Sequence, residues 1–162
     1  MSFRSTAAAV IASLVILLAA VATTTAVTYA QDDEPRIFHT IRMTPRDDAD
    51  PAKVEEVLAK VRHLGSTSED VEDFIVGADM SGEYEISITY ILEGYDGYHA
   101  YLFDPLHIEI DKMALPLAKS MELLDVVETD DPAAAAARLA AMQQERFEKV
   151  EGLLEMFQQI GK

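Results

Sequence analysis

The chain has 162 residues, which is enough for one domain with additions at its ends. It carries 13 basic and 29 acidic residues, a net charge of −16, and a surface of this kind disfavours binding to nucleic acid or to anionic lipid headgroups. It contains no cysteine, which excludes disulfides, lipidation through a cysteine and thiolate-based zinc or iron–sulfur sites.

Residues 1–30 have the composition of a secretory signal peptide. One early cation, Arg4, precedes a run of apolar or small residues from Ala7 to Ala22, and the small residues Thr28 and Ala30 stand before the acidic "QDDE". We therefore expect export to the periplasm or the medium, with cleavage after Ala30 and no membrane contact afterwards. The alternative is an uncleaved membrane anchor, although the run barely reaches the ~20 apolar residues that a spanning helix needs. Cleavage removes one of the 13 basic residues and leaves 12 against 29 acidic ones, a net charge of −17.

Residues 31–35 form a short acidic linker, and a strand and a helix are predicted after it. In "RIFHTIRM", residues 36–43, side chains alternate with period two, which predicts a strand. A helix is expected to start at Asp50-Pro51, because the carboxylate can cap a free amide and proline suits the first helical turn. Gly65 is expected to end this helix. Its apolar residues recur at helical spacing and are Val54, Val57, Leu58, Val61 and Leu64.

Two further strands, a second helical region and a last strand complete the predicted domain. Strands are expected over 71–79 and 84–92, and the short link "MSGE" between them predicts an antiparallel hairpin. A helical region broken at Asp104-Pro105 follows, and "MELLDVVE", residues 121–128, predicts the final strand. This order is that of a ferredoxin-like β-α-β-β-α-β sandwich, an α+β fold in which helices cover one face of a four-stranded antiparallel sheet.

The second face of the predicted sheet is also apolar. The residues assigned to it are Phe38, Phe74, Ile91, Leu124 and Val126. A sheet with two apolar faces needs a second cover, and face-to-face pairing of two such sheets would supply it. We therefore expect a homodimer.

A single amphipathic helix is predicted over residues 131–160. It begins at a third Asp-Pro pair, Asp131-Pro132, and continues through an alanine-rich first half. Its apolar stripe consists of Phe147, Val150, Leu153, Leu154, Phe157 and Ile160. Two interpretations stay open: the stripe packs within its own domain or dimer, or the helix is an interaction module that recruits another protein.

His107 is the histidine best placed for chemistry. It follows the helix start at Asp104-Pro105 by three residues, where the positive end of a helix favours a neutral imidazole that can accept a proton. The alternative is a hydrogen-bonded residue at the edge of the core. No pair of histidines has the spacing of a metal motif, and no nucleotide-binding or nucleophile motif is present. We predict neither a metal nor a cofactor.

Residues 36–128 resemble the stress-responsive dimeric α/β-barrel (Dabb) family. The resemblance depends on the strand "RIFHTIRM", the hairpin "VGAD…GEYEISITYIL" and the segment "YHAYLFDPLHIEI" with the later "LLDVVE", and "YLFDPLH", residues 101–107, is its most specific part. It implies a ferredoxin-like unit whose two copies pair sheet to sheet into a barrel. The export signal and the long final helix depart from the usual single-domain pattern of this family.

The resemblance also implies a site. In a plant member, a polyketide cyclase without a cofactor, catalysis uses a histidine matching His107 and a tyrosine matching Tyr101, and a histidine matching His39 lines the pocket. Related dimeric barrels include monooxygenases that bind apolar ligands. The main hypothesis is an exported Dabb homodimer that binds a small apolar or aromatic ligand at His39, Tyr101 and His107, or has a stress-related structural role. The alternative is a cofactor-independent cyclase, lyase or monooxygenase with His107 as the general base, which requires the three side chains to meet at one cavity.

Overall fold

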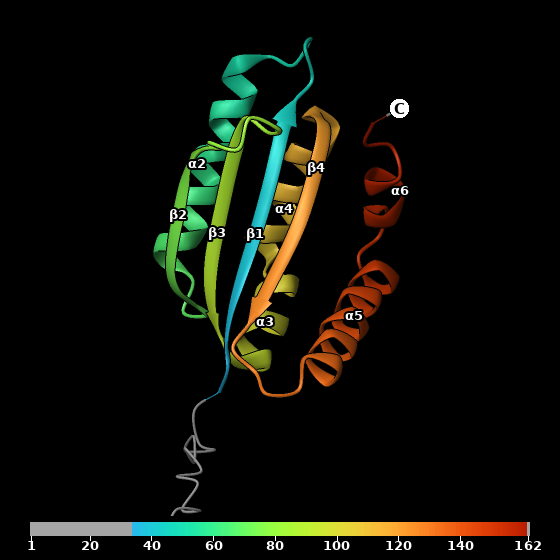
Figure 1. The fold of residues 1–162 in the computed structure, drawn as a ribbon. Helices are drawn as coiled ribbons and strands as arrows, with labels where there is room; N and C mark the ends of the chain where they lie inside the picture. Colours follow the sequence, from blue (N-terminus) through green and yellow to red (C-terminus); the bar gives the residue numbers. More distant parts are fainter. Residues whose placement is uncertain (1–33, 162) are drawn as a thin grey trace, which may run out of the picture. The chain divides into compact units, whose positions relative to one another are not determined.

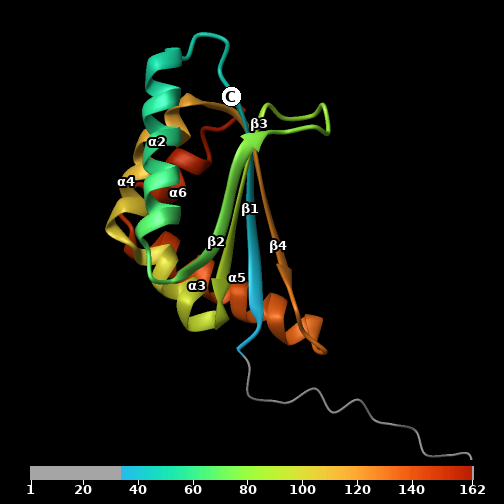
Figure 2. The ribbon, with the colours of Figure 1, turned by 90° about the vertical axis from the view of Figure 1, so that its left-hand side faces the viewer.

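The computed structural model describes residues 34–161, which form a four-stranded antiparallel sheet with helices on one face (Figures 1 and 2). The strands lie in the order β2-β3-β1-β4 and are β1 (Arg36–Pro45), β2 (Val71–Ala78), β3 (Ile86–Glu93) and β4 (Ala118–Val127). The helices are α2 (Pro51–Thr67), α3 (Gly94–Phe103), α4 (Pro105–Ala114), the 3-10 helix η1 (Leu115–Leu117), α5 (Pro132–Lys149) and α6 (Leu153–Phe157). The predicted ferredoxin-like fold is confirmed, with its helical break at the expected place. The predicted signal peptide lies outside the described residues.

Three aspartates fix where helices begin. Asp50, Asp104 and Asp131 each stand immediately before α2, α4 and α5 respectively, and each accepts a hydrogen bond from a backbone amide of the first helical turn. Proline follows each aspartate, as the sequence predicts. Within residues 34–161, no helix combines the length and the apolar character needed to span a membrane.

The position of Gly65 differs from the prediction. Helix α2 passes through Gly65 and ends at Thr67, so the glycine does not end the helix. A Cβ at this position would lie 2.4 Å from Cγ of Phe74 on β2, so the missing side chain permits close approach of helix and strand. Phe74 therefore faces the helices, opposite Tyr90 of β3, and its predicted place on the second face is wrong.

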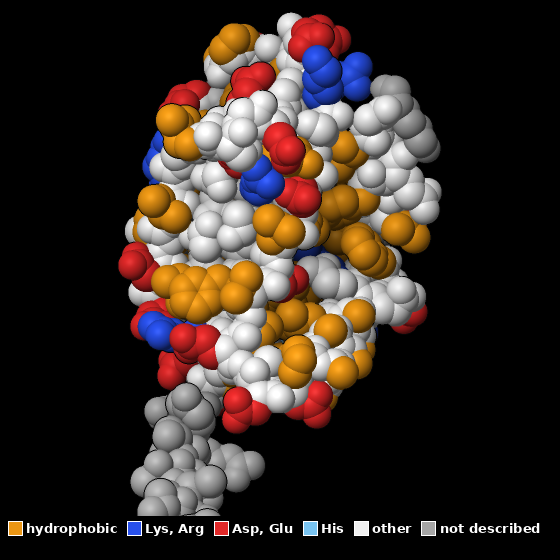
Figure 3. Space-filling model, in the orientation of Figure 1, with side chains coloured by type: hydrophobic (Ala, Val, Ile, Leu, Met, Phe, Trp, Pro, Cys, Tyr) orange, Lys and Arg blue, Asp and Glu red, His pale blue; other side chains and the backbone are white. Residues whose placement is uncertain are grey.

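The second face of the sheet carries exposed apolar side chains. Phe38 on β1 stands between Ile91 and Val126 in the register, and Leu124 lies two residues before Val126 on β4. Val126 is 63% exposed, and Ile75 of β2, which takes the place predicted for Phe74, is 68% exposed. We call these five residues the open face. Figure 3 looks onto it and shows hydrophobic groups between charged ones.

The C-terminal segment forms two helices instead of the single one predicted. Helix α5 ends at Lys149, and Gly152, with a φ of 76°, turns the chain before α6. Apart from Leu154, which is 41% exposed, the predicted apolar stripe packs against η1, α4 and the start of β4 on the same domain. This cluster contains Leu115, Met121, Phe147, Val150, Leu153, Phe157 and Ile160. The packing supports the first of the two interpretations of this segment over an interaction module.

Candidate functional site

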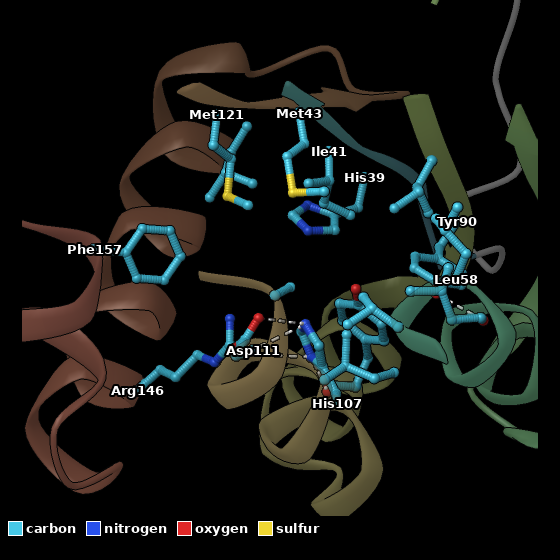
Figure 4. Close-up of a pocket in the computed structure, with 17 residues that line it drawn as sticks. His39, Ile41, Met43, Leu58, Tyr90, His107, Asp111, Met121, Arg146 and Phe157 are labelled. Atoms are coloured by element: carbon cyan, nitrogen blue, oxygen red, sulfur yellow. Dashed lines mark hydrogen bonds and ion pairs between the residues drawn. The ribbon is translucent and has the colours of Figure 1, made fainter. Parts of the chain in front are cut away.

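A cavity of about 50 Å³ lies between the helix side of the sheet and the helices that cover it. Most of its lining is apolar, with side chains from β1, β3, β4, α2, α4 and α6. Figure 4 shows His39 from β1 and His107 from α4 on opposite sides of this space. The predicted residues His39, Tyr101 and His107 all line this one cavity, together with Asp111 and Arg146, which sequence reasoning missed.

His107 is held by both its backbone and its ring. Asp104 caps its amide at 3.2 Å, and its Nδ1 lies 2.8 Å from the carbonyl oxygen of Tyr101, to which Nδ1–H donates. Its lone pair is therefore on Nε2, which lies 3.3 Å from Nη2 of Arg146. Burial, followed by the Arg146 cation, lowers the pKa of His107 well below 6.5. The imidazole is therefore neutral near pH 7.

Tyr101 is a phenol enclosed by both histidines. Its ring stacks on His107 with centroids 4.0 Å apart, and it meets the ring of His39 edge-on at 5.5 Å. Only 1% of the residue is exposed, and burial raises the pKa of its hydroxyl well above 10. Tyr101 therefore stays protonated and can donate a hydrogen bond to an oxygen of a ligand.

His39 is oriented by a carboxylate on the neighbouring strand. Asp125 lies directly opposite His39 in the β1–β4 register, and its Oδ1 is 2.7 Å from Nδ1 of His39. The Tyr98 hydroxyl donates to the other oxygen of Asp125 at 3.3 Å, and the Gln143 amide donates to that hydroxyl at 2.7 Å. This chain of contacts favours the tautomer with hydrogen on Nδ1, which leaves Nε2 of His39 as an acceptor.

Arg146 and Asp111 form a buried ion pair at the cavity. Arg146 is 2% exposed, and its Nη2 donates to Oδ2 of Asp111. Burial raises the pKa of Asp111 to about 6, against the opposing effect of Arg146. Two sequence signals could have found the pair: Arg146 is a lone cation in the helical series Leu139, Met142, Val150, and Asp111 follows His107 by four residues on one helix face.

These groups suit recognition of a small molecule that has an apolar body and a polar head. The cavity offers one phenol donor, one oriented imidazole acceptor and one guanidinium, and the rest of its wall is mainly hydrophobic. The lone pair of His107 faces a cation, so this histidine accepts a proton only if Arg146 moves. Within the described residues, no three imidazole or carboxylate groups are placed together as metal ligands.

Several solved structures share the fold. A dimeric ferredoxin-like protein of unknown function from Thermobifida fusca has a TM-score of 0.53 and 23% identity, over 57% of this chain and 91% of that chain. A Dabb family protein from Mesorhizobium loti has a TM-score of 0.53 and 17% identity, over 59% and 99%. The hydroxynitrile lyase of Passiflora edulis has a TM-score of 0.53 and 10% identity, over 59% and 95%. At these identities the similarity establishes the fold alone.

A match between the sequence and a family model identifies the family. No curated protein matches the chain. The family model described as "Stress responsive A/B Barrel Domain" matches residues 37–128, more than half of the chain, and this range contains His39, Tyr101 and His107. It ends before α5, so Arg146 lies outside it. The chain therefore belongs to the Dabb family of stress-responsive α/β-barrel domains.

Proposed function

We propose that this Dabb protein is an exported homodimer whose cavity binds a small apolar or aromatic molecule. The observation that carries the proposal is the convergence of His39, Tyr101 and His107 on one largely hydrophobic cavity. A concave apolar space with a few polar groups is the usual form of a small-molecule site. The rigid positions of these groups, set by Asp104 and Asp125, favour a ligand of defined orientation.

Ligand-observed NMR with a panel of small hydrophobic molecules tests this proposal. Ala114 lines the cavity and is 8% exposed, so Ala114→Leu should fill the space and abolish binding. Ala100 is exposed on α3, so Ala100→Leu adds the same carbons elsewhere and should leave binding unchanged. Circular dichroism verifies that both variants fold. Absence of binding across the panel, or equal binding by Ala114→Leu, would reject the cavity in favour of a purely structural dimer.

The open face supports the homodimer. Its exposed apolar side chains need a cover, and a second copy of the same sheet offers one. Val126→Glu places a charge on this face, whereas Leu154→Glu places one on α6, where Leu154 is 41% exposed. Analytical ultracentrifugation should find the wild type and Leu154→Glu as dimers and Val126→Glu as a monomer. A monomeric wild type at high micromolar concentration would refute the homodimer.

Export is supported by the composition of residues 1–30. N-terminal sequencing of the protein recovered outside the cytoplasm should find Gln31 as the first residue. An intact N-terminus in the membrane fraction would instead indicate the uncleaved anchor.

A second candidate function is proton-transfer catalysis without a cofactor. The convergence of the two histidines and Tyr101 meets the condition that this hypothesis sets. His107 is the general base that the resemblance implies, and it can act once Arg146 moves from its Nε2. His39, whose Nε2 has no hydrogen-bond partner within residues 34–161, is the alternative base. The test is deuterium exchange from D₂O into acetylacetone, since cyclases and lyases begin with such a proton transfer. Exchange should fall in His107→Gln or His39→Gln and persist in the exposed control His63→Gln; no exchange above background removes this candidate for small ketones.

A further inference from the structure

Arg146 brings a buried cation to the cavity from outside the residues that match the family. A guanidinium has five N–H donors. Within residues 34–161 its hydrogen bonds leave from Nη2 alone, toward Asp111 and the ring of His107. Nε is buried and has no partner in this part of the chain. Nη1 makes no hydrogen bond within residues 34–161 either and, unlike Nε, keeps accessible surface, so an acceptor that this part of the chain does not supply can reach it.

The space beside this cation is apolar and open to a ligand. Ile41, Met43, Met121 and Phe157 line the cavity with Arg146. Figure 3 shows a hollow between β4 and the C-terminal helices, with hydrophobic walls and a basic surface inside it. Figure 4 places Phe157 and Met121 above the guanidinium of Arg146. A molecule that enters here meets hydrophobic walls and the ion pair of Arg146 with Asp111.

We propose that the cavity binds a small carboxylate with a short apolar tail, one of whose carboxylate oxygens accepts a hydrogen bond from Nη1 of Arg146. This inference rests on the proposed ligand-binding function and names the class of ligand. Hydrogen bonds between charged partners are about twice as strong as neutral ones, so an anion is preferred over an amide or alcohol of the same shape. A cavity of about 50 Å³ limits the tail to a few carbons.

The existing ion pair does not block this role. Asp111 contacts Nη2 only and holds the guanidinium in place. Ligand binding therefore costs little side-chain conformational entropy. A second negative charge is tolerated because burial already raises the pKa of Asp111 to about 6 and the carboxyl can take up a proton. Five cationic or ionisable groups face Asp111, and they are Arg146 from α5, His107 from the same helix, His39 from β1, Tyr90 from β3 and Tyr101 from α3.

The test compares isobutyrate with isobutyramide, which has nearly the same shape without the charge, and with isobutanol as a neutral apolar probe. NMR titrations of the purified protein follow the methyl groups of Met43 and Met121, which line the cavity. Isobutyrate should bind at least about tenfold more tightly than isobutyramide, as expected for a hydrogen bond to a charged group. Arg146→Gln should remove this preference. Arg138→Gln, on the same helix with a side chain 53% exposed, should keep it.

Each outcome decides between the two proposals. Equal binding of isobutyrate and isobutyramide, or a preference that persists in Arg146→Gln, overturns the carboxylate site. Entry of isobutanol without isobutyrate overturns it and leaves the ligand cavity in place. If none of the three probes enters, while Ala114→Leu and the wild type behave alike toward every hydrophobic probe, the cavity itself is refuted. If Arg146→Gln does not fold, the comparison of the two probes on the wild type, located by the Met121 methyl, decides alone.

Discussion

The substitution Gly65→Ala sets two known effects against each other at the contact between α2 and β2. In an open helix, alanine stabilises relative to glycine by about 1 kcal/mol. Here the new Cβ would lie 2.4 Å from Cγ and 2.6 Å from Cδ1 and Cδ2 of Phe74. These are the ring atoms nearest the backbone, so a side-chain rotation cannot move them far. Helix and strand must therefore move apart until the contact reaches an ordinary distance of 3.4 Å or more. Overpacking of this kind costs about 1–3 kcal/mol. Less the gain of about 1 kcal/mol, we expect a net loss of up to about 2 kcal/mol.

Gly97→Ala is the matched control. Gly97 lies within α3, and its added Cβ would meet only the Asp70 carbonyl oxygen at 3.7 Å, an ordinary contact. The helix preference then acts alone and should stabilise the protein by about 0.5–1 kcal/mol. Urea denaturation followed by far-UV circular dichroism measures both variants. The double variant Gly65→Ala/Phe74→Leu should recover part of the loss. The reasoning fails if Gly65→Ala is as stabilising as Gly97→Ala with an unchanged m-value.

Three further predictions concern the site. The pKa of Asp111 is about 6 in the folded protein against an ordinary 3.8, so between these pH values the folded protein binds more protons than the unfolded one. This group therefore lowers the free energy of unfolding by up to about 3 kcal/mol as pH rises from 4 to 6. Denaturation at several pH values should find this slope missing in Asp111→Asn. His107 acts in the opposite direction, because its lowered pKa removes stability as pH falls below 6.5. Asp125→Asn should release His39 from one tautomer, which ¹⁵N shifts of the ring would report; unchanged shifts would contradict the contact. Asp104→Ala removes the cap of α4 and should cost about 1 kcal/mol in urea denaturation, and no loss would show that the cap is not needed.

Strand order and helix starts were predictable because they depend on local signals. Period-two alternation marks β1 and β3, and the three Asp-Pro pairs mark helix starts through a hydrogen bond that spans only two or three residues. Which side chains of β2 face the helices was not predictable. A register irregularity between Val71 and Asp73 places Val71 and Phe74 on the same side, although strict alternation would separate them.

The site shows the same division. His39, Tyr101 and His107 were found through their resemblance to a family, and their positions depend on strand register and one helix cap. Arg146 was missed because its place as a lone cation in an apolar helical series does not identify its partner. Its partner Asp111 is 35 residues away on another helix, so only the tertiary fold brings the two together.

The cavity is bounded partly by the shared domain and partly by the appended helices, while the open face lies on the far side of the sheet. Under the proposed function, substitutions on α5 and α6 would change which molecules the cavity accepts without touching the surface where two subunits would associate. Ligand preference and assembly can diversify independently in such a protein, since a terminal appendage can be exchanged while the sheet that organises the fold stays the same.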